Sequence, residues 1–451
     1  MRESIKITLI IIISGIILIL PNTIRALNNN QYMINSDSYY TLRTYNQQFD
    51  GLQQRPLPFS IFHYIPLFEN IVIARVLPLL LGIMTALLSY FILRKHNMPE
   101  KNINAIIILL IVSPIFIYTF SELKLYAVAL ALTLLCILLL SYKKIALASI
   151  LFIIIPLIDI YASILSLVFV FIYIALSNKS LKNNLIFILI ALISVAAAIG
   201  INYFFNYPIF KYIPIESPNL LSDTGIKNGF SFSSLILSLI GLILLWEKGL
   251  KNIIIYVSFI LILVLSMFST SLKAYINMIL IIFAGFAFIY LNRRKWSIQL
   301  IKRVTILLII CSILFTTILF ITKTSNLAPD ADYVDAMLFI KKQSNPEEKI
   351  LSSPDNGFML QYYTDRATYL DDKSSMFDKE LLIELSNLTS SRNLERTENI
   401  LRKNNLRYVF IDKDFKQFLE QEEGLLYIIE TSNKFTNIYK SNKAEVWLYT
   451  E

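Results

Sequence analysis

The feature that most constrains this chain is a succession of long apolar stretches. Each covers roughly 17–22 residues, the length that crosses the hydrocarbon core of a bilayer as a helix. They do not alternate between apolar and polar residues, as transmembrane barrel strands do. Only 16% of the 451 residues are charged and 56% are hydrophobic, whereas about a quarter of an ordinary soluble domain is charged. The excess apolar surface must face lipid, so we predict an α-helical polytopic membrane protein.

The apolar stretches predict eleven membrane-spanning helices. No small-residue cleavage site follows the first stretch, so we expect it to be retained as the first helix. The predicted spans are 5–23, 70–93, 103–120, 125–141, 145–158, 160–177, 185–205, 231–246, 253–268, 274–291 and 304–322.

The distribution of basic residues predicts the orientation. Connections on one side are short and basic, as at Arg94-Lys95 and Arg293-Arg294, which the positive-inside rule assigns to the cytoplasm. We therefore expect a protein of the plasma membrane whose N-terminus is cytoplasmic. Because the number of predicted spans is odd, the C-terminal end of the chain is expected on the outer side. We expect a transmembrane domain at 1–322, with long outer loops at 24–69 and 206–230, and a soluble extracytoplasmic domain at 323–451.

The C-terminal domain has the pattern of a small α/β fold. Helical periodicity covers 331–342, 379–388 and 394–404, and the segment 407–411 reads as a strand. Residues 347–352 lead into a short strand, and Asp355-Asn356-Gly357 is a turn signal.

Composition also excludes several functions. The net charge of +9 reflects orientation, because no basic module interleaved with aromatic residues predicts nucleic-acid binding. Cys136 and Cys311 both lie in apolar stretches without metal-ligand spacing. No glycine-rich phosphate loop is present, which argues against an ATP-driven pump.

The first candidate cluster follows the first predicted helix, in the segment from Asn35 to Arg43. The Asp37 carboxylate is suited to act as a general base or to bind a metal ion. Arg43 is suited to pair with a lipid phosphate. The alternative is an amphipathic loop in which Asp37 serves as a cap.

Other candidates lie where spans are expected to end on the outer side. Glu122 and Lys124 occupy a short turn followed by Tyr126, and the alternative is an interfacial ion pair that snorkels. Asp159 lies at the outer end of a short predicted helix, where burying an acid in the membrane is costly and indicates a functional role. The alternative is that Asp159 lies in a solvated turn. Lys273 is a candidate for holding a phosphate, or a snorkelling lysine.

The order of these clusters resembles the GT-C class of glycosyltransferases. The chain begins with a helix, which is followed by an outer loop that opens with an acid and Tyr-Tyr-x-x-Arg. Helical hairpins with acids on the outer side come next, and an outer C-terminal domain ends the series. Residues 37–43 resemble the first acidic motif of oligosaccharyltransferase catalytic subunits, although Thr41 stands where that family often has histidine. The resemblance implies that Asp37 is the catalytic or metal-binding acid.

A second match is partial. The segment from Ser353 to Gly357, followed by Asp365-Arg366, resembles the Trp-Trp-Asp-Tyr-Gly block of the same family. Asp355 and Gly357 match, but both tryptophans and the tyrosine are absent, which puts recognition of the acceptor sequon in doubt. Glu122 stands alone where the family's second motif has two acids.

The resemblance implies an inverting transferase that moves a sugar from a polyprenyl-phosphate or diphosphate donor to an extracytoplasmic protein, lipid or glycan. It assigns catalysis, and the binding of a divalent cation such as Mg²⁺ or Mn²⁺, to Asp37 and Glu122. The residues assigned to substrate binding are Tyr39, Tyr40, Arg43, Lys124, Tyr126, Asp159, Lys273, Asp355 and Arg366. Two alternatives remain open: a transporter or flippase of lipid-linked sugars, which usually shows internal repeats, and an inactive scaffold of the same fold.

Overall fold

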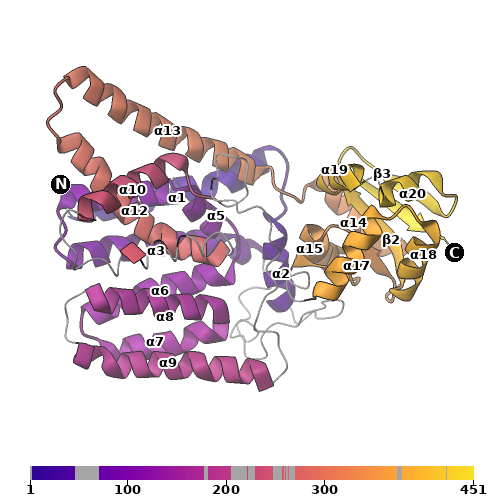
Figure 1. Cartoon of the computed structure of the whole chain (residues 1–451), viewed down its shortest axis with the longest axis horizontal. Helices are drawn as coiled ribbons and strands as arrows, with labels where there is room; N and C mark the ends of the chain where they lie inside the picture. The colour runs from indigo at the N-terminus through magenta and orange to yellow at the C-terminus, as the bar shows by residue number, and fades with distance from the viewer. Residues whose placement is uncertain are drawn as a thin grey trace. The chain divides into compact units, whose positions relative to one another are not determined.

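The computed structural model describes residues 3–45, 71–176, 181–204, 221, 229–246, 256–257, 260, 263, 270–372, 378–422 and 424–450 (Figure 1). The chain divides into two compact units. We call the first the helical unit; its described residues fall within 3–27, 71–204 and 221–326. The second, the C-terminal unit, combines residues 28–45 with 327–450.

The helical unit is built from apolar helices that match the predicted stretches. They are α1 (Glu3–Leu27), α3 (Ile71–Lys95), α4 (Glu100–Ile111), α5 (Pro114–Ser121), α6 (Leu125–Ser141), α7 (Ile145–Ile158), α8 (Ile160–Leu176), α9 (Leu181–Phe204), α10 (Phe232–Trp246), α12 (Thr270–Arg293) and α13 (Gln299–Ser325). The predicted span at 253–268 lies largely outside the described residues.

Several of these helices are suited to cross a membrane. Among the described residues, α1, α3, α9, α12 and α13 are long and apolar enough, and α4 with α5 makes a sixth if the bent pair counts as one span. The helices α6, α7, α8 and α10 are apolar but shorter. The chain is therefore mostly helical with five to six candidate spans, and the full count of eleven stays a prediction.

The predicted continuous span 103–120 is wrong in one respect: two helices replace it, bent by 57° at Val112-Ser113. Pro114 occupies the first turn of α5, where its missing N–H costs nothing. The Ser113 hydroxyl caps this turn by accepting a hydrogen bond of 3.3 Å from the Phe116 amide. Ser113 also accepts a hydrogen bond of 2.9 Å from the Asn277 side chain in α12.

Close approach of α12 to α4 and α5 fixes their relative direction. A Cβ on Gly285 would lie 2.4 Å from the Ile106 side chain, so only glycine allows this contact. Since Asn277 meets Ser113 and Gly285 meets Ile106, α12 runs antiparallel to the α4–α5 pair. The beginning of α12 therefore lies toward the end of α5.

The C-terminal unit contains a four-stranded mixed sheet with helices around it. Its elements are α2 (Ser36–Tyr45), α14 (Ala331–Gln343), β1 (Lys349–Leu351), η5 (Pro354–Asn356), α15 (Gly357–Thr364), α17 (Lys379–Ser390), α18 (Leu394–Lys403), β2 (Leu406–Asp412), α19 (Lys413–Glu422), α20 (Leu425–Thr431), β3 (Phe435–Lys440) and β4 (Ala444–Tyr449). The strand order is β1-β2-β4-β3, with β1 parallel to β2 and the other pairs antiparallel.

The helices predicted at 331–342, 379–388 and 394–404 and the strand at 407–411 are confirmed as α14, α17, α18 and β2. The turn at Asp355-Asn356-Gly357 is present as η5 and the start of α15. The segment around Asp37 is a helix, α2, rather than a loop. It is tied to this unit because the Asn35 amide donates to the Ala328 carbonyl at 3.0 Å.

Candidate functional site

Asp37 is the one side chain of the segment from Ser36 to Arg43 that is not buried. It lies in the first turn of α2, where a carboxylate interacts favourably with the helix dipole. No described residue donates a hydrogen bond to the carboxylate or forms an ion pair with it. The burial of its neighbours holds α2 in place, while the Asp37 carboxylate takes no part in holding it among the described residues.

The two tyrosines after Asp37 attach α2 to α15. The Tyr39 ring lies 5.1 Å from the Tyr362 ring and 5.3 Å from the Tyr363 ring, and the Tyr39 and Tyr363 hydroxyls are 3.0 Å apart. The Tyr40 ring lies 4.8 Å from Phe358. Burial, followed by the nearby Tyr39 hydroxyl, raises the pKa of Tyr363, so it stays neutral and hydrogen-bonded at neutral pH.

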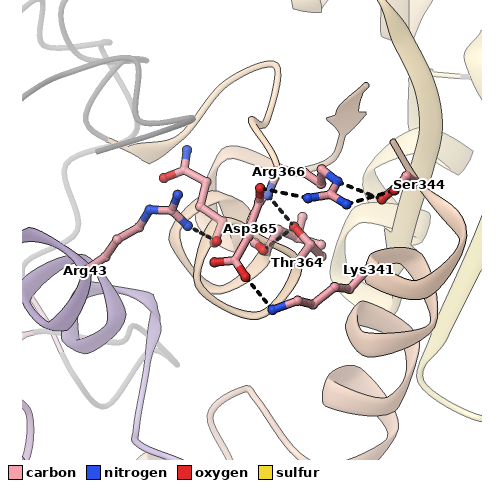
Figure 2. Close-up of polar contacts among 8 residues, drawn as sticks. Arg43, Lys341, Ser344, Thr364, Asp365 and Arg366 are labelled. Atoms are coloured by element: carbon pink, nitrogen blue, oxygen red, sulfur yellow. Dashed lines mark hydrogen bonds and ion pairs between the residues drawn. The ribbon is translucent and has the colours of Figure 1, made fainter. Parts of the chain in front are cut away.

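Arg43 makes the second attachment between these helices. Its guanidinium is almost fully buried and donates a hydrogen bond to the Gln361 carbonyl in α15, as Figure 2 shows. The Gln361 amide in turn donates to Thr368 Oγ1 at 2.9 Å and to Asp371 Oδ2 at 3.1 Å. Arg43 is therefore engaged within its own unit in this structure.

The second motif region, 353–366, is also tied into the unit (Figure 2). Arg366 donates to Ser344 Oγ at 3.0 Å and to the Ser344 carbonyl at 2.8 Å, at the end of α14. Lys341 forms an ion pair with Asp365, which adopts a left-handed conformation with φ of 55°. Asp355 is exposed in η5. The fold thus brings together two motifs that lie more than 300 residues apart in the sequence.

Gly357, which matched the family block, is explained by packing. A Cβ at this position would lie 2.6 Å from Asp371 Cβ and 2.7 Å from Asp371 Cα. The backbone of α15 can approach Asp371 this closely only because residue 357 has no side chain.

Glu122 and Lys124 form a buried ion pair in the helical unit. Both residues are extended, with φ/ψ of −124°/153° and −126°/134°, so their side chains point to the same side. Glu122 Oε2 lies 2.9 Å from Lys124 Nζ, and their side chains are 0% and 2% exposed. Lys124 Nζ also lies 3.0 Å from the centroid of the Tyr118 ring and 5.8 Å from that of Tyr126.

Two further cations are buried at the same end of the helical unit. Lys273 lies in the first turn of α12, not in a loop before it, and is 5% exposed. Arg25, which the sequence analysis did not select, is 1% exposed in the last turn of α1 and donates to the Ser325 carbonyl at 3.1 Å. An apolar cluster of Tyr118 with Phe320 connects the end of α5 to the end of α13.

Asp159 and Tyr275 take part in polar contacts between helices. Asp159 Oδ1 accepts a hydrogen bond of 3.0 Å from the Ala162 amide, which makes it the cap of α8. The Tyr275 hydroxyl lies 2.8 Å from Ser166 Oγ, which lies 2.6 Å from Thr133 Oγ1. Sequence reasoning missed this chain of buried hydroxyls joining α6, α8 and α12, because the serine and threonine are isolated within apolar stretches.

The residues described do not fit a resident divalent cation. Within them, no three histidine, cysteine, aspartate or glutamate side chains gather closely enough to hold a metal ion. The Glu122 carboxylate is engaged with Lys124, a cation that a bound metal ion would have to displace. We derive no step through a metal, and the predicted use of Mg²⁺ or Mn²⁺ stays a prediction.

Comparison with solved structures relates the whole fold to known enzymes. The archaeal oligosaccharyltransferase AglB of Archaeoglobus fulgidus, in complex with an inhibitory peptide and a dolichol-phosphate, matches with a TM-score of 0.62 and 12% identity, over 99% of this chain and 74% of that one. ArnT of Cupriavidus metallidurans bound to undecaprenyl phosphate matches with a TM-score of 0.56 and 12% identity, over 99% and 98%.

The mycobacterial arabinofuranosyltransferase AftD matches with a TM-score of 0.58 and 13% identity, over 100% of this chain and 42% of that one. No protein-family model matches the sequence, and a search of curated proteins finds no match. The fold resembles that of the GT-C glycosyltransferases over the full length of the chain, which confirms the resemblance drawn from the sequence. At these identities the likeness concerns the fold alone.

Proposed function

We propose that this protein is a membrane glycosyltransferase that moves a sugar from a polyprenyl-phosphate or diphosphate donor to an extracytoplasmic acceptor. The observation that carries the proposal is the full-length likeness to three transferases, two of which were solved with a polyprenyl or dolichol phosphate. A second support is the set of buried charges at one end of the helical unit. The acceptor class is left open among protein, lipid and glycan.

The donor phosphate would be held by the buried cations. Arg25, Lys124 and Lys273 lie at one end of the helical unit, where Glu122 is the carboxylate paired with Lys124. A buried charge is costly in a membrane protein and is usually retained for function. Cations in a site of low dielectric stabilise the negative charge that develops on a departing phosphate more strongly than they would in water.

Asp37 would act as the general base. The acceptor O–H or N–H loses its proton to the Asp37 carboxylate as its oxygen or nitrogen attacks the anomeric carbon. A new bond forms between the acceptor atom and the anomeric carbon, and the bond from that carbon to the phosphate oxygen breaks. The electron pair leaves with the polyprenyl phosphate. The half-buried side chain of Asp37 amid buried neighbours supports this role.

The side chains around Asp37 would position it. Tyr39, Tyr40 and Arg43 are buried and contact α15, so they fix the helix that carries Asp37. Their predicted contact with the donor stays a prediction, as do the substrate-binding roles of Tyr126, Asp159, Asp355 and Arg366.

The test is turnover by the full-length protein in lipid. Purified protein is incubated with polyprenyl-phosphate sugars and an extract of cell-envelope acceptors, and free polyprenyl phosphate is measured by chromatography. We expect release of the free carrier by the wild type, loss of release in Asp37→Asn, and normal release in Asp335→Asn, a matched change at an exposed carboxylate of α14.

The same preparation separates the alternatives. Movement of the intact lipid-linked sugar across sealed vesicles, without release of free carrier, would establish a transporter and contradict the proposal. If the protein binds several lipid-linked sugars but neither releases free carrier nor moves the lipid-linked sugar across the membrane, the inactive-scaffold hypothesis is supported and the proposal is contradicted.

A further inference from the structure

The second ligand site that the structure suggests lies at the opposite end of the helical unit, where α12 ends and α13 begins. A groove of about 380 Å³ is lined there by Asn292 and Gln299, by Lys302 and Arg303, and by Ile306, Leu307 and Ile310. In chain order, the polar and cationic lining residues come first, up to Arg303, and the apolar lining residues follow further along α13. This arrangement has the chemistry of a phospholipid, with an anionic headgroup and apolar chains.

The turn that leads into the groove is fixed by its own contacts. The Trp296 indole N–H donates to the Leu291 carbonyl at 3.0 Å, and the Arg294 amide donates to the Tyr290 carbonyl at 2.8 Å. Tryptophan is enriched at the membrane interface, where its ring contacts apolar groups and its N–H meets polar ones. The headgroup end of the groove is thus preorganised at a depth that suits a lipid phosphate.

No acid among the described residues compensates the positive charge at this groove. At the same end of the unit, Glu100 lies 2.6 Å from Lys6, and Glu3 forms an ion pair with Arg94. Of the residues that the structure describes, none forms an ion pair with Lys302 or Arg303. Arg293, Arg294 and Lys295 add to the local positive charge. The described acids of this end, Glu3 and Glu100, are paired with other cations, so an anionic ligand would complement the described part of the groove.

The apolar part of the groove continues along α13. No side chain between 299 and 312 is buried. Leu307 is 60% exposed and Ile310 40% exposed. Figure 1 shows α13 beginning at the end of the unit that holds the chain's N-terminus. Acyl chains running parallel to this helix would cover its exposed face while the phosphate meets Lys302 and Arg303.

We propose that the groove between the end of α12 and the start of α13 binds an anionic phospholipid of the adjacent leaflet, with its phosphate on Lys302 and Arg303 and an acyl chain on Ile306, Leu307 and Ile310. This proposal is independent of the glycosyltransferase function. A basic residue near a membrane surface contributes about 1 kcal/mol to the binding of anionic lipid, which is about a fivefold change in affinity.

The experiment is a lipid titration of the full-length protein in detergent micelles, followed by native mass spectrometry. The probes are dioleoylphosphatidylglycerol and dioleoylphosphatidylcholine, which share acyl chains and differ in charge. We expect tighter binding of the anionic lipid, and about 25-fold weaker binding of it by Lys302→Gln/Arg303→Gln. The matched control, Lys143→Gln/Lys144→Gln, removes two exposed lysines that do not line the groove and should leave affinity unchanged.

Three results would overturn the proposal. Equal affinity for the two lipids would exclude recognition of charge. Unchanged binding by Lys302→Gln/Arg303→Gln, or equal loss in the control variant, would place the lipid elsewhere. Displacement of the lipid by excess inorganic phosphate would show that the groove recognises phosphate alone, without the acyl chain; a lipid site predicts no displacement.

Discussion

One ion pair in each unit shows how differently charges of the same chemistry are placed in this protein. In the helical unit, the side chains of Glu122 and Lys124 are 0% and 2% exposed. In the C-terminal unit, Lys341 and Asp365 make a pair of the same chemistry with side chains that are 45% and 42% exposed. An exposed pair contributes less than about 1 kcal/mol to stability, whereas burying two charges costs several kcal/mol that their mutual contact and their other polar contacts must offset.

The difference separates charges that folding explains from charges that it does not. Several polar contacts of the C-terminal unit fasten one element to another, as Arg43 fastens α2 to α15. The buried ions of the helical unit would be replaced by apolar residues at little cost to the fold, and their burial supports the proposed contact with the donor phosphate. Asp37 differs from its buried neighbours in α2, because its carboxylate fastens nothing that the structure describes.

The largest effect is expected at the buried pair. Lys124→Met leaves the Glu122 carboxylate buried without its cation and should lower the free energy of unfolding by about 3–5 kcal/mol. The double variant Glu122→Gln/Lys124→Met removes both charges and should recover most of that loss. Unfolding of the purified protein in mixed micelles with increasing denaturing detergent measures both. If Lys124→Met lowers the free energy of unfolding by no more than Lys341→Met does, the buried and the exposed ion pairs do not differ in their effect on stability.

A smaller effect tests whether the family-like glycine is structural. Gly357→Ala forces a Cβ against Asp371 and should destabilise the C-terminal unit by about 1–3 kcal/mol. The control is Gly200→Ala in α9, where no atom lies within 4 Å of the added Cβ and helix propensity favours alanine. Thermal unfolding followed by circular dichroism measures the two variants. Equal stability of Gly357→Ala and wild type would remove the packing explanation and restore a binding role for the motif.

The sequence predicted the helices and strands of the C-terminal unit better than it predicted the contacts around Asp37, for a physical reason. Local patterns found α14, α17, α18 and β2, because periodicity and turn residues act over a few neighbours. The contact of Tyr39 with Tyr363 joins residues 324 apart, and no local pattern encodes such a pair. The sequence therefore indicated both motifs without showing that Tyr39 and Arg43 are used within the fold.

The helical unit shows the same limit. Apolar length predicted the helices well, and α6 and α7 begin and end where expected. Pro114 directly after Ser113 was the signal of the break between α4 and α5, and the apolar run around it hid that signal. The Glu122–Lys124 pair was predicted as one of two alternatives, but as a snorkelling pair at the interface. Lys124 is instead covered by the ring of Tyr118, which lies four residues before Glu122 and six before Lys124.

The stability of the C-terminal unit should depend on pH through the buried carboxyl of Asp412. Burial raises the pKa of Asp412 above its ordinary value of 3.8, although its hydrogen bonds from Asn356 and the Phe415 amide oppose the shift. A carboxyl with a raised pKa stabilises the folded state at low pH and loses this contribution as pH rises through the folded-state pKa. Asp412→Asn should therefore gain stability relative to wild type as pH rises above 4.

The measurement is a series of unfolding curves for wild type and Asp412→Asn at several values of pH. A constant difference between the two proteins at every pH would contradict the assignment of the raised pKa to Asp412.

The smallest effect is expected at the exposed pair. Lys341→Met should change the free energy of unfolding by less than about 1 kcal/mol, and increasing salt should reduce the effect further. Unfolding at low and high salt checks both statements. A loss of several kcal/mol would show that the exposed and buried pairs are equivalent.

The most direct test of the central claim is the rate of carrier release by Asp37→Asn at saturating polyprenyl-phosphate sugar. A general base acts in the transition state and contributes typically 10²–10⁴-fold. We expect kcat to fall by at least about 100-fold while the KM for the donor stays near that of wild type. Unchanged kcat in a folded, membrane-inserted Asp37→Asn protein would contradict it.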